Sequence, residues 1–94
     1  MEIVWRQAAL NDLEAIREFI AENNPVAAAR VRAAVRAAVE RLAVYPNLGR
    51  AGRVEGTREL IIAGTPFIAA YRVLGDQLRI LSIIHSSRQW PRRF

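Results

Sequence analysis

The spacing of the hydrophobic residues changes twice along the chain, and each change predicts a change of secondary structure. In residues 2–6 the apolar side chains Ile3 and Trp5 fall on one face and Val4 falls on the other, which predicts a short strand. From about Ala8 the apolar residues recur at helical spacing, which predicts a first helix. The apolar stripe of this helix is Leu13, Ile16 and Ile20.

A second helix is predicted from Pro25 to about Val44. Asn24 is a favourable residue at the start of a helix, and Pro25 falls in the first turn, where helices tolerate proline. The rest of the surface of this helix is mostly alanine and arginine. Its apolar stripe is Val31, Val35, Val39 and Leu42.

Residues 45–56 contain Pro46 and three glycines, which predict a loop. Beyond this loop the apolar positions alternate with a period of two, which predicts strands at residues 57–63, 67–74 and 77–85. Short turns at 64–66 and 75–76 separate these strands. The side chains expected on one face are Phe67, Tyr71 and Val73 in the second of the three strands, and Leu78, Ile80 and Ile84 in the third.

The order of these elements predicts an α+β fold in a single domain, residues 1–94. Strands joined by short turns are antiparallel, and a two-helix hairpin on one face of such a sheet buries the apolar stripes of both. We therefore expect an N-terminal strand, a two-helix hairpin and three antiparallel strands, with the helices packed on one face of the sheet. The other face is expected to be free to bind a partner.

Composition narrows the class of protein. Hydrophobic residues make up 52% of the chain and charged residues 24%, as in a folded globular domain. There is no cysteine, no apolar run near the ~20 residues of a membrane span, and no sign of a signal peptide at the start. We expect a cytoplasmic protein without membrane association. One histidine and scattered carboxylates predict no metal site, and no glycine motif predicts a nucleotide cofactor.

All 14 basic residues are arginine, and the net charge is +5. Arginine pairs with carboxylates and phosphates through two parallel hydrogen bonds, although a genomic bias toward arginine codons would give the same composition. The charge is compatible with either a nucleic acid or an acidic protein as partner.

Two groups of residues are candidates for function. His85 is able to serve as a general base and Arg88 to stabilise a phosphorane, as an RNase requires; alternatively, His85 ends a strand and has a structural role. Trp90 is able to stack on a base, or to fold back over the core while the arginines around it stay solvated. Arg58 and Arg72 fall within predicted strands, where a charged residue usually marks the solvated face. The arginines around Trp90 are Arg88, Arg92 and Arg93.

The order and spacing of several segments resemble the RelE/ParE superfamily of toxins from type II toxin–antitoxin systems. The resemblance covers essentially the whole chain. It implies a small toxin that a co-encoded antitoxin neutralises by wrapping around it. The segments that carry it are "DLEAIREFI", "PNLGR", "REL", "YRV" and "ILSIIH" followed by Arg88.

The resemblance is closer to the ParE branch than to the RelE branch. RelE-like toxins cleave mRNA in the ribosome with basic residues and a C-terminal tyrosine or similar group. At the three strand positions that are basic in RelE-like toxins this chain has Glu59, Ile61 and Ile68, and Phe94 stands at the position of the C-terminal tyrosine. Only Arg88 matches. The ending "HSSRQWP" is also more similar to ParE-like endings.

ParE-like toxins poison DNA gyrase by binding it and have no catalytic site, so the resemblance implies a non-enzymatic toxin without a cofactor. Its implied partners are a ParD-like antitoxin and gyrase, with no sequence-specific binding of nucleic acid. The alternative is a RelE-like mRNA endonuclease that uses His85 and Arg88. The residues expected to contact the antitoxin or the target are Arg58, Arg72, Arg88, Trp90, Arg92 and Arg93.

Overall fold

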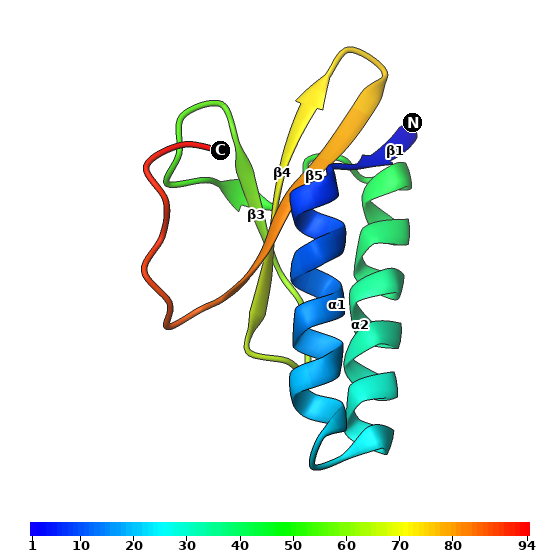
Figure 1. Ribbon diagram of the computed structural model, residues 1–94. Helices are drawn as coiled ribbons and strands as arrows, with labels where there is room; N and C mark the ends of the chain where they lie inside the picture. The colour runs from blue at the N-terminus through cyan, green and yellow to red at the C-terminus, as the bar shows by residue number, and fades with distance from the viewer.

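Two helices pack on one side of a five-stranded sheet, and the C-terminal segment lies on the other side (Figure 1). The computed structural model describes all residues, 1–94, and confirms the predicted α+β fold. Neither helix is long and apolar enough to cross a membrane. The elements, in chain order, are β1 (Glu2–Trp5), α1 (Gln7–Ala21), α2 (Pro25–Val44), β2 (Arg50–Ala51), β3 (Arg58–Ile61), β4 (Phe67–Leu74) and β5 (Gln77–His85).

The helical hairpin forms as its sequence predicts. The side chain of Asn24 accepts a hydrogen bond of 3.0 Å from the backbone N–H of Ala27, and Pro25 occupies the first turn of α2. These two residues fix the start of α2, because an unpaired N–H of the first turn gains an acceptor and proline has no N–H to leave unpaired. The apolar stripes of both helices lie in or against the core cluster beneath them.

The sheet has the order β1-β5-β4-β3-β2, so the first strand of the chain lies next to the last. β1 runs parallel to β5, with Ile3 opposite Leu78 and Trp5 opposite Ile80. The other neighbours are antiparallel. Ile3 and Trp5 both pack against the core on the helix side, as the alternation in β1 predicts.

The predicted loop at residues 45–56 contains one further short strand that the sequence did not reveal. β2 pairs with β3 at the edge of the sheet, with Arg50 opposite Glu59. β3 is shorter than predicted, because the carbonyl of Ile62 accepts hydrogen bonds from the backbone N–H and the hydroxyl of Thr65 within the turn instead of from β4. The sequence did not predict β2, because the glycines and proline of its segment are typical of a loop.

The prediction that Ile84 shares a face with Leu78 and Ile80 is wrong. Between Ala70 and Tyr71 of β4 the partner in β5 changes from Ser82 to Ile80, so Leu81 is an extra residue in the pairing. Such a bulge shifts the alternation of the residues that follow it. The helix-side core therefore contains Ile83, and Ile84 lies on the opposite face, across from Ile68.

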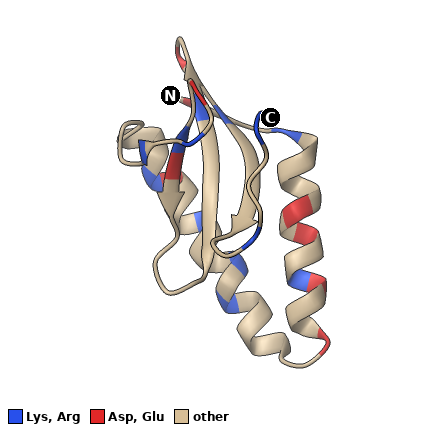
Figure 2. Ribbon diagram, turned by 90° about the vertical axis from the view of Figure 1, so that its left-hand side faces the viewer, with Lys and Arg blue, Asp and Glu red and all other residues tan.

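The sheet face away from the helices is less open than predicted. Ile68, Ala70, Leu81 and Ile84 are all buried, although none of them belongs to the helix-side core. The C-terminal segment crosses this face (Figure 2). The protein thus covers part of its second sheet face with its own chain.

Candidate functional site

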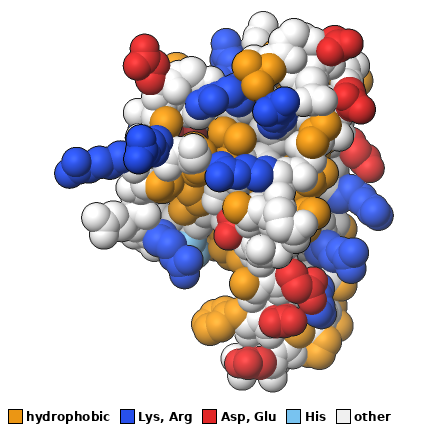
Figure 3. Space-filling view, turned by 45° about the horizontal axis from the view of Figure 1, so that its top comes forward, with side chains coloured by type: hydrophobic (Ala, Val, Ile, Leu, Met, Phe, Trp, Pro, Cys, Tyr) orange, Lys and Arg blue, Asp and Glu red, His pale blue; other side chains and the backbone are white.

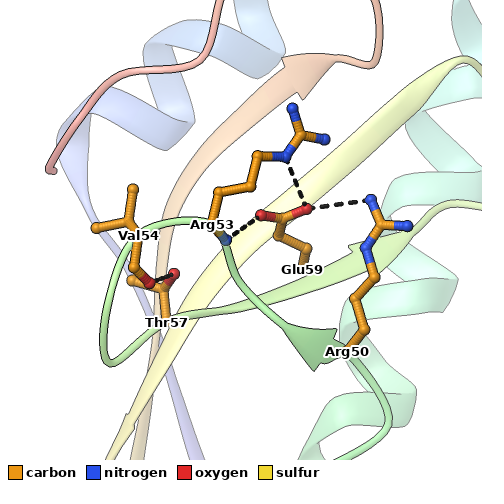
Figure 4. A network of polar contacts seen from close by, with 5 residues as sticks. All are labelled: Arg50, Arg53, Val54, Thr57 and Glu59. Atoms are coloured by element: carbon orange, nitrogen blue, oxygen red, sulfur yellow. Dashed lines mark hydrogen bonds and ion pairs between the residues drawn. The ribbon is translucent and has the colours of Figure 1, made fainter.

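A buried carboxylate organises the loop between β2 and β3. Glu59 is 2% exposed, and one of its oxygens accepts a 2.7 Å hydrogen bond from the backbone N–H of Arg53. The other oxygen accepts from Nη2 of Arg50 at 3.1 Å and lies 3.5 Å from Nε of Arg53 (Figure 4). In the same loop the hydroxyl of Thr57 donates to the carbonyl of Val54 at 2.6 Å. A buried charge needs such partners, so Glu59 holds both arginines close to the sheet.

The C-terminal segment is attached to this loop through an aromatic contact. The guanidinium carbon of Arg53 lies 4.0 Å from the ring centre of Trp90, a distance at which a cation is attracted to the face of an indole. The indole Nε1 is buried and has no hydrogen-bond acceptor. Of the two roles considered for Trp90, the structure places it folded back, with one face occupied by the protein's own arginine.

Arg58 does not lie on the face that the sequence suggested. It stands opposite Tyr71 in the sheet, and Tyr71 is fully buried on the helix side. Nη1 of Arg58 donates to the carbonyl of Gly49 at 2.7 Å. The prediction that Arg58 and Arg72 share the solvated face is therefore wrong, because they lie on opposite faces of the sheet.

Tyr71 fixes the start of the loop that follows α2. Its hydroxyl donates to the carbonyl of Pro46 at 2.7 Å and accepts from the N–H of Gly49 at 2.9 Å. Burial raises the pKa of the Tyr71 hydroxyl, while the hydrogen bond from Gly49 and the charge of Arg58 act in the opposite direction. A Cβ at Gly49 would lie 2.7 Å from Cε1 and from the hydroxyl of Tyr71, so only glycine fits this contact.

His85 is engaged in local contacts at the end of β5. Its Nδ1 accepts a 3.1 Å hydrogen bond from the backbone N–H of Ser87 and lies 2.8 Å from the hydroxyl of Ser87. The ring also packs edge-on against Phe67, with 5.5 Å between centroids. Arg88 is exposed, and its backbone N–H donates to the carbonyl of His85. These contacts suit a strand end, where the chain turns away from the sheet.

The structure does not bring the six predicted contact residues into one site. Arg58 lies on the helix side and Arg72 on the other face, while Trp90 lies against Arg53. The remaining three, Arg88, Arg92 and Arg93, are exposed in the C-terminal segment. No group of three or more histidine, cysteine, aspartate or glutamate side chains is placed to hold a metal ion.

The sheet face away from the helices has a basic hollow that the sequence analysis did not predict. Its volume is about 540 Å³, and Arg6, Arg72 and Arg79 contribute to its lining. The two-residue turn after β4 pairs Leu74 with Gln77, and this register puts Arg72 directly opposite Arg79. That pairing follows from the turn length, so the sequence did contain a signal for it.

A larger, mostly apolar groove runs along the helical hairpin, with a volume of about 990 Å³. Alanines of α2 form much of its lining, and Ile3 and Trp5 reach it from β1. Arg17, Arg32 and Arg36 also line it. Figure 3 shows basic side chains over the upper middle of the molecule with apolar side chains between them, and acidic side chains both at its upper edges and toward its lower end.

Comparison with known proteins identifies relatives over nearly the whole chain. A family model described as "ParE toxin of type II toxin-antitoxin system, parDE" matches residues 3–90. A protein of Sinorhizobium fredii named "Putative toxin Y4kP" is 45% identical and covers 95% of this chain and 92% of its own length. "Toxin RelE2" of Caulobacter vibrioides is 36% identical, over 93% of this chain and 97% of that protein.

A solved structure has the same fold. It is described as "Chromosomal ParDE TA system from P. aeruginosa" and superposes with a TM-score of 0.82 at 30% identity, covering 90% of this chain and 95% of that one. The likeness extends from the N-terminal strand through the helical hairpin to the antiparallel strands.

Proposed function

Because the chain belongs to the ParE family of toxins from type II toxin–antitoxin systems, we propose that it inhibits DNA gyrase by binding it. The protein acts as a stoichiometric inhibitor in the cytoplasm, with no catalytic step and no cofactor. A cognate ParD-like antitoxin neutralises it by forming a hetero-oligomer.

One observation carries the choice of a non-catalytic mechanism: the strand positions that would need basic side chains for RNA cleavage hold other residues. Glu59 is a buried carboxylate that occupies two of the chain's own arginines. Ile61 is 57% exposed and apolar, and Ile68 is buried. None of these side chains is able to neutralise a scissile phosphate, which is the largest requirement of such a reaction.

The surfaces of the protein suit an antitoxin that binds as an extended, acidic segment. The apolar groove along the hairpin accommodates hydrophobic anchors, and arginines line it. In such interfaces a few buried anchors hold the complex, while charge complementarity mainly speeds association. The similarity to a solved structure described as a ParDE system supports an antitoxin as the protein partner.

The test is to add the purified protein to DNA gyrase with relaxed plasmid, and in parallel to a translation extract whose mRNA is mapped by primer extension. We expect loss of supercoiling or accumulation of cleaved DNA, and intact mRNA. Mixing the toxin with its antitoxin beforehand should restore supercoiling. Cuts in mRNA that require the ribosome, together with unaffected gyrase, would refute the proposal.

The second candidate is a ribosome-dependent mRNA endonuclease, which the name of the relative "Toxin RelE2" favours. In that case His85 is the general base and Arg88 stabilises the transition state. The same pair of assays decides between the two mechanisms, because each predicts the opposite pattern of damage.

A further inference from the structure

The hollow on the second sheet face combines three arginines with apolar side chains. In the sheet, Val4 of β1 pairs with Arg79 of β5, and Arg79 pairs with Arg72 of β4, so the three side chains form one row across the strands. Arg6 follows two residues after Val4. The apolar part of the lining comes from Val4, Leu81 and Phe94.

The arrangement of these arginines is unfavourable for the protein alone. Residues directly opposite each other in a sheet have Cβ atoms about 4.5–5.5 Å apart, and like charges in such a pair are destabilising. The ion pairs of the chain involve Glu14 and Glu59 with other arginines. None of these ion pairs includes Arg6, Arg72 or Arg79. Nε of Arg79 instead donates a 2.7 Å hydrogen bond to the side-chain oxygen of Gln77, which leaves the Nη groups of Arg79 for a partner.

Arg72 also has a buried donor without an acceptor. Its Nε is inaccessible to solvent and makes no hydrogen bond. The guanidinium lies beside the loop at Gly56, where an added Cβ would be 4.0 Å from both Nε and Nη2. Buried polar atoms in folded proteins nearly always have a partner, so the contacts within this chain leave the Arg72 guanidinium incompletely satisfied.

We propose that the hollow binds a carboxylate of a protein partner, namely an aspartate or glutamate with an apolar side chain next to it in the partner's sequence. The carboxylate would accept hydrogen bonds from Arg72 and Arg79, since a guanidinium presents two parallel N–H groups to a carboxylate. The apolar neighbour would pack on Val4, Leu81 or Phe94. The identification of this partner as the antitoxin rests on the function proposed above; the carboxylate site itself does not.

The surroundings favour a protein chain over a nucleic acid. Single-stranded nucleic acid is bound along a basic groove that follows several phosphates, whereas these arginines are gathered in one place. The nearby Glu2 accepts a hydrogen bond from Gln77, another residue of the lining, and adds a negative charge at the edge of the hollow. That charge repels any anion, and the repulsion grows with the number of negative charges brought close, so it disfavours a chain of phosphates more than a single carboxylate.

The test uses the full chain labelled with ¹⁵N, so that the Nε–H signals of the arginines are visible by NMR. The probe is an acetylated and amidated peptide, Gly-Leu-Glu-Leu-Gly, compared with the same peptide carrying glutamine. We expect saturable shifts of the Arg72 and Arg79 signals with the glutamate peptide, and binding about tenfold or more weaker with the glutamine peptide, as for loss of a charged hydrogen bond.

Matched variants separate the site from the general charge of the protein. Arg72→Gln and Arg79→Gln should each abolish saturable binding, with the remaining spectrum showing that the fold is intact. Arg30→Gln removes the same charge from an exposed position on α2, outside both hollows, and should leave binding unchanged.

Three results would overturn the proposal. They are no saturable shift at millimolar peptide, equal binding of the glutamine peptide, and tighter binding of a thymidine oligonucleotide to the same signals. These measurements involve neither gyrase nor the ribosome. A negative toxicity assay therefore does not test the carboxylate site, and a negative peptide titration does not test the proposed inhibition of gyrase.

Discussion

The hydroxyl of Tyr71 joins the sheet to the loop that follows α2, and its removal should destabilise the protein strongly. Tyr71→Phe keeps the ring in the core but leaves the N–H of Gly49 without its acceptor and the carbonyl of Pro46 without its donor. A phenylalanine ring fits the same space, so no cavity larger than one oxygen atom is formed.

The cost follows from these two contacts. Leaving one buried polar group unsatisfied costs about 1–3 kcal/mol, so we expect Tyr71→Phe to lower the free energy of unfolding by about 2–4 kcal/mol, counting the N–H in full and the carbonyl in part. In a domain of this size each kcal/mol lowers Tm by roughly 4–8 °C. Urea and thermal unfolding followed by circular dichroism measure both quantities.

Tyr45→Phe is the matched control, because Tyr45 is 63% exposed. Loss of this exposed hydroxyl should change the free energy of unfolding by no more than about 0.5 kcal/mol. If the two variants prove equally stable, the Tyr71 hydroxyl exchanges its contacts with water without loss, and the loop is not held in the way described.

Three further predictions concern pH, catalysis and partner binding. Burial raises the pKa of Tyr71 above its ordinary value of 10.0. The stability linked to this hydroxyl is therefore complete below the unfolded-state pKa and is lost as pH rises through the folded-state pKa. The difference in stability between the wild type and Tyr71→Phe should accordingly shrink when urea unfolding is measured at strongly alkaline pH. His85→Gln should retain growth inhibition nearly in full when expressed in cells, whereas a general base would lose ~10²–10⁴-fold in rate; a large loss with unchanged folding would contradict the structural role of His85. Glutamate in place of Arg58, Arg72 or Arg88 should slow association with the antitoxin and weaken the dependence of the association rate on salt. If stopped-flow association rates change neither with ionic strength nor with any of the three substitutions, these arginines do not belong to the interface.

Much of the fold was predictable because its signals are local. The Asn24–Pro25 start of α2 and the tight turn after β4 depend on residues adjacent in sequence. The bulge at Leu81 was not predictable, because it depends on how β5 fits both β4 and α1. Asp12 of α1 accepts hydrogen bonds from the hydroxyl of Ser82 and from the backbone N–H of Ile83, and no pattern within β5 announces that contact.

The candidate surfaces were predictable to a smaller extent. The rule that a charged residue in a strand marks the solvated face holds for Arg72, which lies away from the helices. It fails for Arg58, which the strands pair with the buried Tyr71. The contact between Arg53 and Trp90 joins two loops, and loops carry no periodicity from which such a contact could be inferred. The role of Glu59 was likewise hidden, since a lone acidic residue in a strand usually marks an exposed position.

The pairing of β1 with β5 has a consequence for synthesis of the protein. Glu2 lies opposite Gln77, so the first strand has no neighbour in the sheet until the last strand exists, and α1 lacks its bonds from Ser82 and Ile83 until the same moment. Contacts between residues this far apart in sequence form late and slowly. We expect the nascent chain to remain without its complete sheet until translation has passed β5, so that the toxin becomes active in one late step and meets its antitoxin as a finished surface.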